Sequence, residues 1–78
     1  MDTANLVKMA NRIGDFFAAL PDAAEARAGI AGHLQRFWEP RMRRQIVAHV
    51  ERGGEGLSGI VREAIEANRQ TLAPDRAA

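Results

Sequence analysis

The sequence predicts an all-α fold, a small antiparallel bundle of about four helices with short connections. Apolar residues recur every three or four positions in four successive segments, which is the spacing of one helix face. Proline and glycine separate these segments, and no alternating apolar pattern of strand length occurs. Because the chain has only 78 residues, these faces must bury one another in an antiparallel bundle or in two packed hairpins.

The first predicted helix begins near the N-terminus and is stopped by Pro21, which removes a backbone donor. Asp2 or Thr3 can cap its start, since a side-chain oxygen there accepts a backbone N–H of the first turn. The apolar face of this helix consists of Leu6, Met9, Ala10, Ile13, Phe16, Phe17 and Leu20.

The second predicted helix covers residues 23–38. Asp22 followed by Glu25 resembles a capping box at its start. Gly29 and Gly32 each cost about 1 kcal/mol in a helix interior relative to alanine. That cost suggests the close approach of another backbone, although chance composition is an equal alternative. The apolar face of this helix consists of Ala23, Ala26, Ile30, Leu34 and Phe37.

Pro40 marks a corner between the second and third helices. It restricts Glu39 to extended or turn geometry, so the second helix ends near Trp38. Proline is tolerated in a first helical turn, so the third helix begins at Pro40 or Arg41 and continues to about Arg52. We expect Trp38 to fill this corner, and the alternative is an exposed anchor for a partner. The apolar positions of the third helix are Met42, Ile46 and Val50.

The fourth predicted helix follows a glycine turn. Gly53–Gly54 can supply the left-handed backbone that ends the third helix, and Ser58 is a typical N-cap for the next one. We therefore expect one helical domain over residues 1–73, followed by a flexible tail over residues 74–78. The apolar face of this helix consists of Ile60, Val61, Ala64, Ile65, Asn68 and Leu72.

The composition predicts a cytoplasmic protein that does not enter membranes. The apolar runs are far shorter than the ~20 residues that span a bilayer, and the N-terminus lacks the features of a signal peptide. The chain contains no cysteine, so disulfides cannot stabilise so small a domain. Association with another chain is the remaining way to stabilise the fold. We therefore expect the isolated chain to be marginally stable or to form a homo-oligomer.

No residue pattern predicts catalysis, cofactor binding or a metal site. His33 and His49 lie on different predicted helices and lack a metal-ligand spacing. Ser58 lacks the GxSxG frame, a preceding strand and an obvious base, so we interpret it as a cap. A helical chain of this length also leaves little room for the buried pocket that most enzymes use.

Basic and aromatic residues gather at the corner and predict a surface that binds a partner. The net charge is +1, but residues 23–52 carry six basic and three acidic side chains. Arginine and tryptophan are enriched among interface hot spots, which favours a protein partner. Phosphate contacts and base stacking are the alternative, although we disfavour nucleic acid because the net charge and the aromatic content are low. The candidate partner-binding residues are His33, Arg36, Phe37, Trp38, Arg41, Arg43 and Arg44.

The three arginines of the third helix cannot form one flat patch. Arg41 and Arg44 share a helix face, whereas Arg43 points about 160° away from Arg41 at 100° per residue. We expect them to lie along the borders of the buried side, with their stems packed on apolar surface. At least one of them is expected to pair with a buried carboxylate of a partner.

Two sequence blocks resemble a known family. The first block is the run FWEPRMRR at residues 37–44, preceded by Ile30-Ala31 and His33. The second block is the run LVKMANRIG at residues 6–14, followed by two phenylalanines. Both are similar to the small delta subunit of cytoplasmic, molybdenum-containing, NAD-dependent formate dehydrogenases. A Gly-Leu-Ser block near residue 57 extends the resemblance over most of the chain. Gly59 departs from the family, which often has proline there, and leaves the start of the last helix in question.

The resemblance implies a non-catalytic accessory subunit. Its partner would be the catalytic subunit of formate dehydrogenase, which carries molybdopterin and iron–sulfur clusters, while other subunits carry flavin and bind NAD. This chain shows no ligand set for any of these groups. The implied role is to support the assembly, maturation or stability of the complex. A small basic helical regulator that binds nucleic acid is the alternative.

Overall fold

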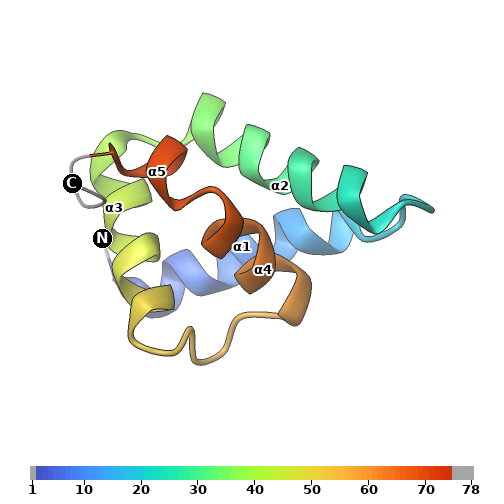
Figure 1. The fold of residues 1–78 in the computed structure, drawn as a ribbon. Coiled ribbons are helices and arrows are strands. Elements are labelled where there is room, and N and C mark those ends of the chain that lie inside the picture. The colour runs from blue at the N-terminus through green and yellow to red at the C-terminus, as the bar shows by residue number, and fades with distance from the viewer. Residues whose placement is uncertain (1, 75–78) are drawn as a thin grey trace.

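A computed structural model describes residues 2–74, and this region folds into five helices without strands (Figure 1). The predicted all-α fold class is therefore confirmed. The predicted flexible tail, residues 74–78, lies outside the described residues except for Pro74, which is exposed. The helices are α1 (Thr3–Phe17), α2 (Ala23–Phe37), α3 (Pro40–Glu51), α4 (Gly59–Ala67) and the short α5 (Arg69–Leu72).

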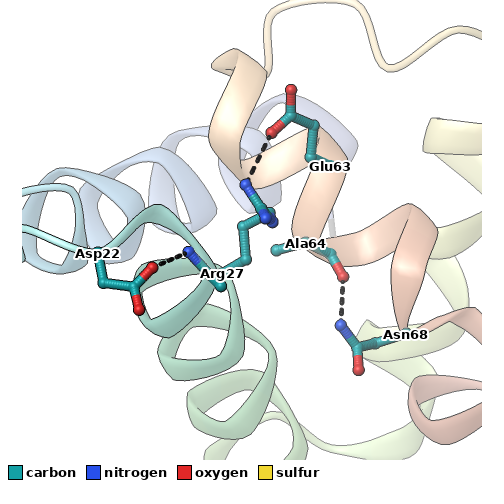
Figure 2. A network of polar contacts seen from close by, with 6 residues as sticks. Asp22, Arg27, Glu63, Ala64 and Asn68 are labelled. Atoms are coloured by element: carbon teal, nitrogen blue, oxygen red, sulfur yellow. Dashed lines mark hydrogen bonds and ion pairs between the residues drawn. The ribbon is translucent and has the colours of Figure 1, made fainter.

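Helices α1 and α2 form an antiparallel hairpin whose turn lies at the far end of the molecule from α3 (Figure 1). Asp2 and Asp22 cap the two helices, each accepting a hydrogen bond from the N–H two residues later, at 3.2 and 2.9 Å (Figure 2 shows the second). The expectation that α1 extends through Leu20 is wrong, because the helix ends at Phe17. The following proline disfavours helical geometry at Leu20, which lies exposed in the turn.

The corner and the glycine turn at the two ends of α3 match the sequence-based expectations. Pro40 occupies the first helical position, where its missing N–H costs nothing. Gly53 and Gly54 have φ angles of 115° and 67°, a backbone that other residues rarely adopt. Their N–H groups donate to the carbonyls of Val50 and His49, both at 2.9 Å, and so satisfy the helix end.

The predicted fourth helix is interrupted, and α4 and α5 take its place. Asn68 separates them, with φ −123° and ψ 24°. Its side-chain amide donates to the carbonyl of Ala64 (2.8 Å), the group that its own N–H would bond in a continuous helix (Figure 2). The N–H of Asn68 turns to Ile65 instead, at 3.2 Å. The prediction of one continuous helix is wrong because this side chain competes with the backbone.

The core lies where α4 packs against both α1 and α2, with α3 and α5 closing one end (Figure 1). Gly14 is buried, and a Cβ atom there would collide with Val61 of α4, so glycine permits the close contact of α1 with α4. An ion pair between Arg27 and Glu63 (3.6 Å) bridges α2 and α4 at the surface (Figure 2). The largest fully buried side chains are Leu6, Ile30, Leu34, Ile46, Val47, Val61, Ile65 and Leu72.

The loop between α3 and α4 is held down by two side chains. The amide of Asn11 donates to the carbonyl of Gly56 and accepts from the N–H of Ser58, both at 2.9 Å. The Nε2 atom of His49 donates to the carbonyl of Glu55 at 2.8 Å. This loop is therefore tied to α1 and α3, although it has no regular secondary structure.

Candidate partner-binding surface

A chain of four rings, exposed at both ends and half-buried in the middle, crosses α1 and α2. We call the side chains of Phe16, Phe17, His33 and Phe37 the aromatic strip. Ring centroids lie 5.1 Å apart from Phe16 to Phe17, 6.3 Å from Phe17 to His33 and 4.7 Å from His33 to Phe37. Phe16 is 75% exposed and Phe37 is 68% exposed, so both ends of the strip face solvent. Rings at such separations support one another, so the strip is a preformed surface.

The prediction that Phe37 belongs to the buried face of its helix is wrong. The chain leaves the helix at Trp38, which has extended geometry and is only 6% exposed. Trp38 turns into the core, and Phe37, the last residue of α2, stays outside against His33. Burial of Trp38 agrees with the corner role and leaves it without the surface that an exposed anchor needs.

Phe16 and Phe17 extend the candidate surface beyond the residues expected from the sequence. Phe17 packs on Gly29 of α2, where a Cβ atom would collide with its ring. Phe16 packs edge-on against Phe17 and remains outside. Helical spacing does not tell the two rings apart, because consecutive residues can both face the core, as Ile46 and Val47 do.

Two shallow hollows flank the aromatic strip and share Phe17 and His33; together we call them the aromatic groove. Its walls combine aromatic rings with small residues and a few cations. On the α1 side the remaining lining is Arg12, Ile13 and Phe16. On the α2 side it is Ala28, Gly29, Gly32, Arg36 and Phe37.

The two glycines of α2 differ in how closely other residues pack against them. Gly29 receives the ring of Phe17, whereas a Cβ atom built on Gly32 would meet nothing of residues 2–74 within 4 Å. The nearest neighbour of Gly29 is therefore a side-chain ring, where the sequence suggested another backbone, and no described residue approaches Gly32 closely. Gly32 instead leaves part of the aromatic groove open.

The arginines of the candidate set divide between two places. Arg36 lines the aromatic groove, while Arg41 and Arg44 line a separate hollow beside Glu39. Arg43 is half-buried, and its Nε atom is buried without a hydrogen-bond partner among residues 2–74. The structure thus brings His33, Arg36 and Phe37 together, but it does not join the arginines of α3 to them.

Other polar residues have structural roles or do not converge. The His49 ring holds the loop between α3 and α4, and Ser58 takes part only through its backbone N–H, which donates to Asn11. No group of three or more histidines or carboxylates within residues 2–74 could bind a metal ion. Over the same residues, no helix is long and apolar enough to cross a membrane.

Comparison with known families identifies the chain. The model of the family described as NADH-dependant formate dehydrogenase delta subunit FdsD matches residues 5–65. The chain belongs to this family. The resemblance expected from its two sequence blocks is thereby confirmed. Neither a curated protein nor a solved structure matches this delta subunit.

The matched part of the delta subunit contains the candidate surface. Residues 5–65 include α2, α3 and most of α1 and α4, and every residue that lines the aromatic groove. Gly59, where the sequence departs from the family, is the first residue of α4, with Ser58 as its N-cap. The helix therefore starts where the sequence predicted, although the Ser58 side chain makes no capping hydrogen bond.

Proposed function

We propose that this delta subunit is a non-catalytic accessory subunit of a cytoplasmic NAD-dependent formate dehydrogenase. It binds the molybdenum-bearing catalytic subunit and supports the assembly, maturation or stability of the complex. The observation that carries this proposal is the family match over residues 5–65. The exposed aromatic strip supports it, because large exposed aromatic rings are typical of protein interfaces.

The partner-binding residues are part of the proposal. His33, Arg36 and Phe37 belong to the aromatic groove and form the main area of contact with the catalytic subunit. Arg41, Arg43 and Arg44 form a second, more polar area on α3. Trp38 acts indirectly, by fixing the corner that presents both areas, since it is buried.

Co-expression of the tagged delta subunit with the catalytic subunit tests this function. We expect the purified tag to carry the catalytic subunit in a fixed ratio that survives gel filtration. A tag that carries nucleic acid in a salt-sensitive complex, and no catalytic subunit, would instead support a nucleic-acid regulator. Burial of Trp38 weighs against that alternative, because a buried indole cannot stack on a base.

A further inference from the structure

The aromatic groove has the shape and charge to receive one kind of partner segment. We propose that it binds an acidic segment of the catalytic subunit, one that inserts large apolar side chains beside Phe17 and His33 and sets carboxylates against Arg12 and Arg36. This inference rests on the proposed function, because it names the part of the partner that the delta subunit recognises.

The apolar part of the inference follows from the exposed rings. Phe16 and Phe37, the two ends of the aromatic strip, are 75% and 68% exposed. Their rings are held by neighbours, Phe16 by Phe17 and Phe37 by His33, so little conformational freedom is lost when a partner covers them. Exposed rings of this kind are favoured as anchors at interfaces.

The charges that line the groove indicate the sign of the charge that a partner segment should carry. Its ionisable lining residues are Arg12, His33 and Arg36, and no carboxylate within residues 2–74 lines either hollow. Asp15 and Glu25 are exposed on the same helices but do not line the groove. Carboxylates of a partner segment would therefore meet cations without a competing acid.

The same charges disfavour a second copy of this chain as the occupant. In a two-fold dimer the same patch serves both subunits. Two aromatic grooves facing each other would place Arg12 and Arg36 of one subunit near the same cations of the other, with no carboxylate between them. Like charges brought together at an interface oppose binding.

Open space along α2 indicates how the segment is accommodated. At Gly32, no atom of the part of the chain that the structure describes lies within 4 Å of the place where a Cβ atom would stand. Ala28, one turn earlier, is exposed and small. A partner backbone or a bulky side chain can therefore reach the floor of the groove between Phe17 and Phe37.

Site-specific crosslinking in the purified complex tests the inference. A photoreactive benzoyl-phenylalanine replaces Phe37 in one variant and the exposed Gln70 of α5 in a matched control. We expect Phe37 to crosslink to a catalytic-subunit segment that carries several carboxylates and large apolar residues, and Gln70 not to. A crosslink to a second copy of the delta subunit, to a segment without carboxylates, or with equal yield from both positions would overturn the inference.

Affinity measurements separate the two contributions. Phe37→Ala should weaken binding about 30-fold or more, as loss of a hot-spot ring does, and leave the circular dichroism spectrum unchanged. Arg36→Glu should weaken binding and reduce its dependence on salt, because it removes an attraction between opposite charges. Arg62→Glu is the charge-matched control on α4, outside the groove, and should bind as the unaltered chain does.

The outcomes distinguish this inference from the proposed function. If the unaltered chain forms no complex with the catalytic subunit, the proposed function fails. If the complex forms and both groove variants bind as tightly as the Arg62→Glu control, the function stands and the aromatic groove is not its docking site.

Discussion

Two neighbouring aromatic residues show how sharply the environment changes at the end of α2. Trp38 is 6% exposed and belongs to the core, whereas Phe37 is 68% exposed. The difference arises because the helix ends between them, so the main chain changes direction. Helical periodicity alone cannot predict the burial of Trp38, because this residue lies just after the helix and no longer follows the helical spacing.

Replacing these two residues by alanine should have opposite consequences. Trp38→Ala leaves a large cavity in the core and should lower the free energy of unfolding by about 3 to 5 kcal/mol. Phe37→Ala removes an exposed ring and should change it by no more than about 0.5 kcal/mol. Urea titrations followed by circular dichroism measure both values. Equal destabilisation by the two changes would contradict the placement of Trp38 and Phe37.

Asn11 provides a second test at the scale of single residues. Asn11→Ala removes the hydrogen bonds to Gly56 and Ser58, each worth about 1 kcal/mol. We expect lower stability and faster hydrogen exchange of the Ser58 amide. Asn5→Ala is the control on the same helix, since the contact of the Asn5 side chain given by residues 2–74 is a long one, 3.7 Å to the sulfur of Met9. Similar exchange at Ser58 in both variants would show that Asn11 does not hold the loop.

At the scale of helices, two glycines that look alike in the sequence have different reasons to be glycine. Gly14→Ala should destabilise the protein by about 1 to 3 kcal/mol, because the new methyl group collides with Val61. Gly32→Ala should stabilise it by up to about 1 kcal/mol, because alanine is the better helix former and the site is open. Thermal melts of both variants give the comparison. Stabilisation by Gly14→Ala would mean that α1 and α4 are not in close contact.

The helix boundaries that could be predicted are those set by local chemistry. Asp2, Asp22 and Pro40 define helix starts, and Gly53–Gly54 defines an end, since each acts through its own backbone or a near neighbour. The interruption at Asn68 was missed because the apolar period continues across it. The spacing of apolar residues gives no information about a hydrogen bond from a side chain to the helix backbone.

The candidate surface was only partly predictable from the sequence, because part of it depends on contacts between helices. His33, Arg36 and Phe37 were recognised by residue type and by their closeness to the corner. Phe16 was not, because α1 comes beside α2 only after the chain folds back through the turn at residues 18–22. The sequence therefore predicted one wall of the aromatic groove and missed the other.

At the scale of the whole molecule, the chain buries a small core and leaves rings exposed. No cysteine is present to supply a disulfide, and a chain of 78 residues gains little stability from its core alone. We expect the isolated delta subunit to be helical with a low melting midpoint, or to self-associate so that the midpoint rises with protein concentration. Circular dichroism melts at several concentrations measure this. A concentration-independent midpoint above about 90 °C would contradict the expectation.

We expect the delta subunit to support the enzyme without taking part in its chemistry. The most direct measurement is to purify formate dehydrogenase from cells that do or do not produce this chain, and to determine molybdenum content and formate oxidation for both. We expect less molybdenum-loaded complex without the chain, but nearly unchanged turnover per molybdenum atom in the complex that does form. A complex with full molybdenum and intact subunits whose turnover falls a hundredfold without this chain would contradict it.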